Sequence, residues 1–246
     1  MLDNDGRAAY QELPAQACPM LDRQRAVNEI ALVNQDTGEV TYGIESLFKV
    51  FAVSIPVLKP LFVFRPFVWL MSKIYAFIAF NRRVIIPAPV AANSFELQPT
   101  FKLNYRLAYL FFTWLLTAIV LSAYARLMPG LLPGGSLYRE YLICGGQIFF
   151  QGTIISIIRK NKRWDYLGNM MTISFGGALL LLPVLLLAQL LNLHPIVCAA
   201  WFMGVAGLML LEHIRRSKLL ELGWILTTSW VLYRILVLLL IFLTTN

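Results

Sequence analysis

The sequence predicts a mainly α-helical fold, a polytopic membrane bundle of about five spans that follows a small α/β segment with a β-hairpin and interfacial helices. Of the 246 residues, 59% are hydrophobic and 14% are charged, and the mean hydropathy is +0.67. Soluble domains are about 45–50% apolar and about 25% charged. Residues 101–246 also carry twelve basic and four acidic side chains. These cations lie between long apolar stretches, which indicates loops beside membrane spans and argues against a nucleic-acid partner.

Residues 1–42 are the polar beginning of a predicted first domain, residues 1–83. They contain three basic and seven acidic side chains. Residues 28–33 and 40–42 favour two short strands, and residues 34–39 contain the Asn, Asp and Gly that reversals use. A lone hairpin is marginally stable in water. We therefore expect it to pack on another domain or on the segment that follows.

Residues 43–80 form an apolar segment that three prolines interrupt, at Pro56, Pro60 and Pro66. Its longest uninterrupted piece, residues 67–81, would reach about 22 Å as a helix, less than the hydrocarbon core of about 30 Å. We interpret the pieces as amphipathic interfacial helices, with basic side chains among anionic headgroups. The alternative is the helical core of a small soluble domain. Residues 84–106 are expected to be a linker.

Residues 107–246 are the predicted transmembrane domain, because they contain five uncharged or nearly uncharged stretches of sufficient length. The cation-rich loops follow the second and fourth stretches, which places these loops and the N-terminus in the cytoplasm and the C-terminus outside. The stretches are residues 107–125, 141–158, 167–191, 195–211 and 222–244.

Familiar catalytic signatures are missing from the sequence, which has no Walker loop, zinc-ligand cluster, Gly-x-Ser-x-Gly elbow or dinucleotide fingerprint. His194 and His213 fall on opposite sides of the bilayer in the predicted topology, so they would not share a metal. We therefore expect no metal and no cofactor, and no residue is predicted to be catalytic.

Arg234 is the most unusual residue, because it lies near the middle of the last apolar stretch. A cation at this depth costs several kcal/mol and normally faces a partner or a water-filled cavity. It could bind an anionic headgroup, a quinone oxygen or a substrate carboxylate. Alternatively it pairs with Gln147 or Gln151, which share one helical face, or it reaches backbone carbonyls, and in either case it only holds the bundle together.

Two cysteines, Cys144 and Cys198, each occupy the fourth position of a predicted span. Both spans run from outside to inside, so the sulfurs are expected at similar depth near the outer face. They could form a structural or redox-active disulfide there. The alternative is that each is a small buried hydrophobic residue.

A family resemblance extends over about a third of the chain. It rests on DRQRAVNEIALV at residues 22–33, on TGEVTYGIESLF at residues 37–48, and on Trp69, Tyr75, Asn81 and Arg82 at the end of the segment. Together these resemble the C-terminal half of a DCC-family thiol-disulfide oxidoreductase, whose domains are thioredoxin-like. The membrane domain is similar to the helical extension of some bacterial members. The resemblance implies a partial thioredoxin-like α/β remnant and a place in the bacterial inner membrane.

The departure from the family concerns its dithiol. Family members carry an Asp-Cys…Cys motif at the start of the first helix, where the helix N-terminus favours a thiolate. Cys18 is the one cysteine of the first hundred residues and has no second cysteine two residues away. We therefore expect an N-terminally shortened member, to which no catalytic residue of the family carries over.

Three functions follow as hypotheses. The resemblance implies a redox or electron-transfer component that lacks its dithiol in this chain, with membrane lipids and a redox protein as partners. A second hypothesis is a non-enzymatic membrane scaffold or assembly factor. The third is a small transporter or lipid-binding bundle that uses Arg234.

Overall fold

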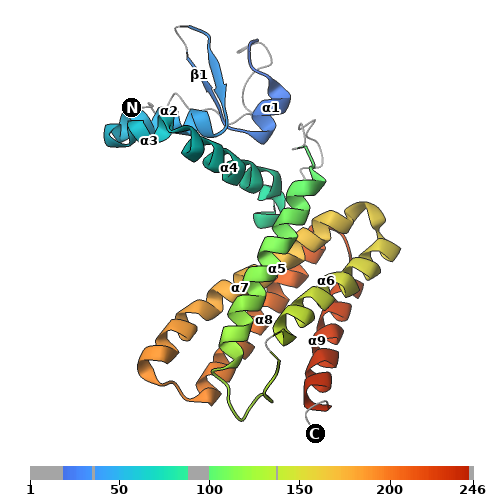
Figure 1. Ribbon diagram of the computed structural model, residues 1–246. Coiled ribbons are helices and arrows are strands. Elements are labelled where there is room, and N and C mark those ends of the chain that lie inside the picture. The colour runs from blue at the N-terminus through green and yellow to red at the C-terminus, as the bar shows by residue number, and fades with distance from the viewer. Residues whose placement is uncertain (1–18, 35–36, 88–99, 137, 244–246) are drawn as a thin grey trace. The chain divides into compact units, whose positions relative to one another are not determined.

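The computed structural model of the chain describes residues 19–34, 37–87, 100–136 and 138–243 (Figure 1). Its contacts divide the chain into two compact units. The first unit comprises residues 1–82 and 90–105, and the second comprises residues 83–89 and 106–246. Among the described residues, five helices between Leu103 and Leu243 are long and apolar enough to cross a membrane, and six if the bent pair Pro56–Val63 and Arg65–Ile85 forms one span. The architecture is that of a multi-pass membrane protein.

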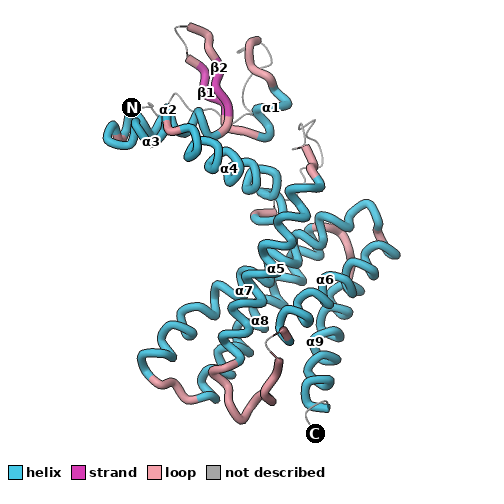
Figure 2. The backbone as a smooth tube through the Cα atoms, in the orientation of Figure 1, coloured by secondary structure: helices cyan, strands magenta, loops and turns pink. Residues whose placement is uncertain are grey.

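The predicted hairpin is confirmed in the first unit. Strand β1 (Ala31–Val33) pairs antiparallel with β2 (Val40–Tyr42), with Ala31 opposite Tyr42 (Figure 2). Residues 35–36 of the predicted turn lie outside the described residues. Gly38 has a φ of 72°, a left-handed conformation that glycine adopts without a steric penalty.

The first strand begins later than predicted. Residues 28–30 were expected to be extended, but Asn28 is the last residue of helix α1 (Arg23–Asn28). This helix forms because the Asp22 side chain accepts the Arg25 backbone N–H at 3.0 Å and so caps its first turn. The described part of this unit has one two-stranded sheet, and its interpretation as a thioredoxin-like remnant stays a prediction.

Four helical pieces follow the hairpin, and each of the three prolines lies at the first or second residue of a piece. They are α2 (Ile44–Ser54), η3 (Pro56–Leu58), α3 (Lys59–Val63) and α4 (Arg65–Ile85). The predicted end of the last piece at residue 81 is wrong, since α4 has 21 residues. Its polar end is accommodated because the Asn81 amide donates to the carbonyls of Phe77 and Tyr105, and Arg82 donates to that of Val27.

The linker is shorter than the predicted residues 84–106. Residues 84–85 belong to α4 and residues 103–106 to α5, while residues 88–99 lie outside the described part. Arg106 explains the early start of α5, because its buried guanidinium donates to the Trp164 carbonyl at 2.6 Å and lies 3.6 Å from Asp165. A cation that marks a loop in the sequence is thus part of the helix.

The five candidate spans match the five predicted stretches in order. The fourth helix continues eight residues past its predicted end at residue 211, to Leu219, because Arg215 and Arg216 both donate to the Glu212 carboxylate on its last turns. The helices are α5 (Leu103–Ala125), α6 (Arg139–Ile158), α7 (Arg163–Leu191), α8 (Pro195–Leu219) and α9 (Ile225–Leu243).

Successive spans run in opposite directions, so the cation-rich connection between α6 and α7 and the cation-rich last turns of α8 lie at the same end of the bundle (Figure 1). Lys162, between α6 and α7, donates to the Leu220 carbonyl and pairs with Glu221, between α8 and α9. At the other end, the Tyr124 hydroxyl near the end of α5 donates to the Cys198 carbonyl near the start of α8. Large apolar side chains such as Leu142, Phe149 and Ile157 are exposed on the outside of the bundle, as lipid contact requires.

Candidate functional site

A network of buried polar side chains, the Tyr166 network, joins four spans in the second unit. The Tyr166 hydroxyl on α7 donates to Gln151 Oε1 on α6 at 2.8 Å and lies 3.1 Å from His213 Nε2 on α8. The other ring nitrogen of His213 lies 3.1 Å from the hydroxyl of Thr227 on α9. Gln151 Nε2 donates to Ser229 Oγ, also on α9, at 3.2 Å. Each donor in this network therefore has an acceptor.

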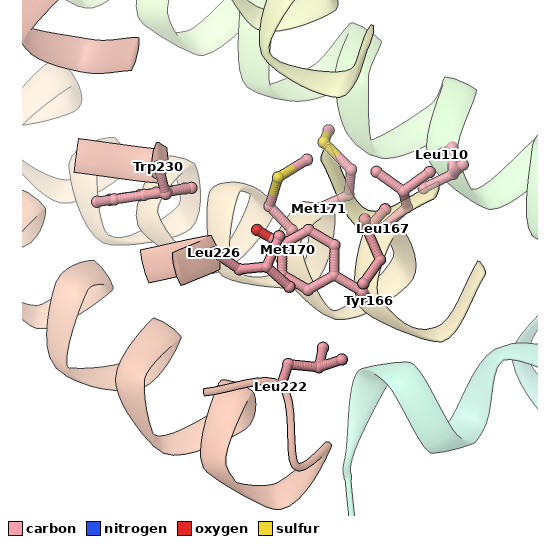
Figure 3. Close-up of a cluster of buried hydrophobic side chains, with 9 residues drawn as sticks. Leu110, Tyr166, Leu167, Met170, Met171, Leu222, Leu226 and Trp230 are labelled. Atoms are coloured by element: carbon pink, nitrogen blue, oxygen red, sulfur yellow. The ribbon is translucent and has the colours of Figure 1, made fainter. Parts of the chain in front are cut away.

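Apolar side chains surround the Tyr166 network. Figure 3 shows the Tyr166 ring among Leu167, Met170, Leu222 and Leu226, which come from α7, from the turn before α9 and from α9 itself. The tyrosine is 2% exposed. A polar network that is fully satisfied inside an apolar core specifies how helices pack. We interpret this network as the element that fixes α6, α7, α8 and α9 relative to one another.

Replacing Tyr166 by phenylalanine is expected to lower the free energy of unfolding by about 1–3 kcal/mol, because Gln151 and His213 each lose a buried partner. The matched control is Tyr138→Phe, since Tyr138 is 69% exposed and should change stability by less than about 0.5 kcal/mol. Unfolding of the full chain in detergent micelles measures both values. Equal stability of the two variants would contradict the role of the network.

A second polar region is a small cavity of about 50 Å³ in the core of the same unit. Five buried side-chain polar atoms of the described residues have no hydrogen-bond partner. Three of these five belong to residues that line this one cavity: Thr117 Oγ1 from α5, Gln147 Nε2 from α6 and Arg234 Nε from α9. Buried polar groups are normally paired, so three unpaired atoms at one cavity indicate a missing partner.

Arg234 is the tenth residue of the nineteen in α9 and therefore lies at the middle of its span. Its guanidinium carbon stands 4.2 Å from the centre of the Trp230 ring, a cation–π contact that does not neutralise the charge. The four acidic residues of 101–246, namely Glu140, Asp165, Glu212 and Glu221, each pair with other cations. Among the described residues, Arg234 has no counter-ion.

The chemistry of the cavity follows from its donors. Arg234 and Gln147 each present an N–H group, the Thr117 hydroxyl can turn to donate, and the guanidinium carries a positive charge. Gln147 is 6% exposed and Thr117 is 4% exposed, so bulk water does not satisfy either group. Donors and a positive charge fit a hydrogen-bond acceptor with negative charge. They do not fit a metal cation, which requires lone-pair donors such as carboxylates, thiolates or neutral imidazoles.

The structure separates the two glutamines that the sequence placed on one face. Gln151 belongs to the satisfied network, and Gln147 lines the cavity with Arg234. Arg234 Nε and Gln147 Nε2 both lack a hydrogen-bond partner among the described residues. Both are donors, so the alternative in which Arg234 pairs with a glutamine stays a prediction. Sequence reasoning did not find Thr117, Tyr166, Ser229 or the role of His213. Their signal, a polar side chain inside an apolar span, is weak when each is considered alone.

The proposed disulfide between Cys144 and Cys198 is absent, since both are free thiols in the structure. Cys198 is 0% exposed and packs with Tyr124, Leu181 and Val205. Cys144 lines the cavity that contains Arg234. The two cysteines therefore occupy different surroundings, and Cys198 behaves as the small buried residue of the alternative interpretation.

Both thiols should react with an alkylating reagent when the chain is unfolded without a reductant. Before unfolding they should react slowly, because both are buried. Peptide mapping by mass spectrometry distinguishes the modified cysteines. A peptide pair that joins residues 144 and 198 through sulfur would contradict the structure.

The described residues contain no group of three or more His, Cys, Asp or Glu side chains that could hold a metal ion. His194 lies at the start of α8, where its ring accepts the Ile196 backbone N–H, and His213 belongs to the Tyr166 network. Comparison of the chain with protein-family models, curated proteins and solved structures found no match. The function of the cavity at Arg234 is therefore inferred from the cavity's own geometry.

Proposed function

We propose that this chain is a multi-pass membrane protein that binds a small anionic group inside its helical bundle, at a site made by Arg234, Gln147 and Thr117. The observation that carries this proposal is the convergence of three unpartnered polar atoms, one on a cation without a counter-ion, on one cavity. A charged residue inside a span marks a ligand or ion site by default. The proposal is a form of the third hypothesis, a small transporter or lipid-binding bundle that uses Arg234, with a small anion as the ligand in place of a lipid.

The size of the cavity limits the ligand. A water molecule needs about 10–15 Å³ of such volume, so a cavity of about 50 Å³ accommodates a few non-hydrogen atoms. A halide, formate or the carboxylate end of a small solute meets this limit. A phospholipid headgroup is too large to enter whole. Small monovalent anions are therefore the ligand class that the site fits best.

The placement in the membrane stays a proposal in its details. The cations of the α6–α7 connection and of the last turns of α8, which lie at one end of the bundle, favour a cytoplasmic position for that end. This orientation leaves the C-terminus outside, and the family resemblance favours a bacterial inner membrane. The thiol-disulfide function that the same resemblance implies stays a prediction, as does a role as a scaffold, and neither explains the unpaired donors at Arg234.

Thermal unfolding of the full chain in detergent micelles tests the proposal, with sodium formate or sodium gluconate at equal ionic strength. Gluconate is too large for the cavity and serves as the control anion. At a formate concentration about one hundred times the dissociation constant, the folded state gains about 2.7 kcal/mol, which corresponds to a rise of about 5–11 °C in the unfolding midpoint. Equal midpoints in formate and gluconate, with chloride equally inert, would contradict the proposed site.

A further inference from the structure

The first unit presents an unusually apolar exposed segment. From residue 53 to residue 66, each residue except Phe62 is exposed to solvent, yet Ser54, Lys59 and Arg65 are the only polar residues among the fourteen. Val57 is 85% exposed and Val63 is 77% exposed. The surfaces of water-soluble proteins rarely contain an exposed apolar segment of this length, and such segments mark contacts with membranes or other proteins.

Aromatic packing explains why this segment points outward. The Phe48 ring of α2 stacks on Phe62 of α3 at 4.6 Å between centroids and on Phe67 of α4 at 5.7 Å. These contacts direct Phe62 inward and hold α2, α3 and the start of α4 beside one another. The remaining side chains of η3 and α3 have no place in this small core. They form the exposed surface of residues 53–66, which we call the apolar ridge.

The charges around the ridge have one sign. Residues 46–95 contain no aspartate or glutamate and six basic residues. Lys59 and Arg65 lie within the ridge, and Lys73 follows on α4, 5.9 Å above the ring of the exposed Trp69. No described carboxylate lies within salt-bridge distance of Lys59, Arg65 or Lys73. The ridge therefore lacks internal counter-charges, and its complement is a surface that is apolar inside and anionic outside.

The chain itself keeps the ridge near a bilayer. Helix α4 ends at Ile85, and α5, the first candidate span, begins at Leu103. Seventeen residues lie between them, and an extended chain covers at most about 3.3–3.6 Å per residue. Because five candidate spans follow, the bilayer is the apolar and anionic surface that is always within reach.

We infer that the apolar ridge binds the surface of an anionic lipid bilayer. Its apolar side chains enter the boundary of the acyl region, and Lys59, Arg65 and Lys73 extend to the lipid phosphates, as basic amphipathic segments do. Trp69 lies at the headgroup level, which is the preferred place of tryptophan. This inference is independent of the anion site at Arg234, because it rests on residues of the first unit.

Spin labels on the full chain in nanodiscs test the inference. A label is placed at Val57→Cys or Val63→Cys, with Thr37→Cys of the hairpin as the exposed control, in a Cys18→Ser background where Cys144 and Cys198 are buried. Accessibility to oxygen and to a water-soluble nickel chelate is measured in phosphatidylcholine alone and with phosphatidylglycerol. In the anionic discs both ridge labels should favour oxygen, at a depth of about 5–10 Å, whereas the control favours nickel.

The charge requirement has its own variant. The triple change Lys59→Glu, Arg65→Glu and Lys73→Glu affects exposed side chains and should shift the unfolding midpoint by less than about 6 °C. In the triple variant, both ridge labels should become accessible to the nickel chelate in anionic discs. Three results would overturn the inference. The first is that the ridge labels stay accessible to nickel in anionic discs. The second is that the labels insert equally in neutral and anionic discs, and equally in the triple variant. The third is that the labels lie at the bilayer centre, in which case Pro56–Val63 and Arg65–Ile85, which are bent by 89°, form a broken span.

Discussion

Replacing Arg216 by alanine is expected to lower the free energy of unfolding by about 3 kcal/mol, since one buried cation holds several groups. Its guanidinium donates to the Val84 carbonyl at 2.6 Å, to Asn169 Oδ1 at 2.9 Å and to the Ile85 carbonyl at 3.2 Å. It also binds Glu212 at 2.7 Å. Arg216 is 8% exposed, so water does not replace it. The unfolding midpoint should fall by about 6–12 °C.

Arg215 provides the matched control for this change. It is the preceding residue and binds the same carboxylate of Glu212 at 2.6 Å, but its side chain is 53% exposed. Exposed ion pairs contribute about 0–1 kcal/mol, so Arg215→Ala should shift the midpoint by less than about 4 °C. Similar losses for both variants would show that binding to Glu212 matters and that the buried contacts of Arg216 do not.

Replacing Arg234 by leucine is expected to abolish the stabilisation by formate and to leave the anion-free protein as stable or more stable. An unpaired cation in a bundle core is unfavourable, and replacement of buried charges by apolar groups is neutral or stabilising by about 1–4 kcal/mol. Arg234→Lys keeps the charge but not the planar set of donors, so the formate effect should weaken without vanishing. Thermal unfolding in formate and gluconate measures both effects.

The control for Arg234 is the same substitution at an exposed cation of the same unit, Arg126→Leu. Its formate effect should equal that of the wild type. Gln147→Leu removes one cavity donor without removing the charge, so it should give a smaller formate effect. If Arg234→Leu instead lost several kcal/mol of stability in gluconate, Arg234 would be a structural residue and the proposed site would be wrong.

The number and order of the spans were predictable because long uncharged stretches determine them directly. Their ends were not, and the reason is physical. Arg106 and Arg216 look like loop cations in the sequence, but each is buried and donates to backbone carbonyls across a helix contact. The sequence shows that a cation interrupts an apolar stretch. It does not show that an acceptor lies opposite it.

Of the residues at the candidate site, only Arg234, whose burial in a membrane span costs the most free energy, stood out in the sequence as a possible ligand-binding cation. Arg234 is conspicuous because a cation at mid-span is rare. Thr117 and Gln147 become notable only when α5, α6 and α9 bring them to one cavity. Tyr166 and His213 are 47 positions apart in the chain, so their contact could not be inferred from spacing. In the first unit, the Asp22 side chain caps α1, and this helix includes Asn28. Residue 28 was assigned to a strand from the sequence because this cap was not considered.

The most direct measurement is the position of bromide in crystals of the full chain grown with sodium bromide, determined from anomalous scattering. A bromide peak is expected in the cavity, within hydrogen-bonding distance of Arg234 Nε and Gln147 Nε2, and it should be absent in crystals of Arg234→Leu. A cavity without bromide, in which Arg234 instead pairs with a carboxylate or carbonyl of its own chain, would contradict the assignment.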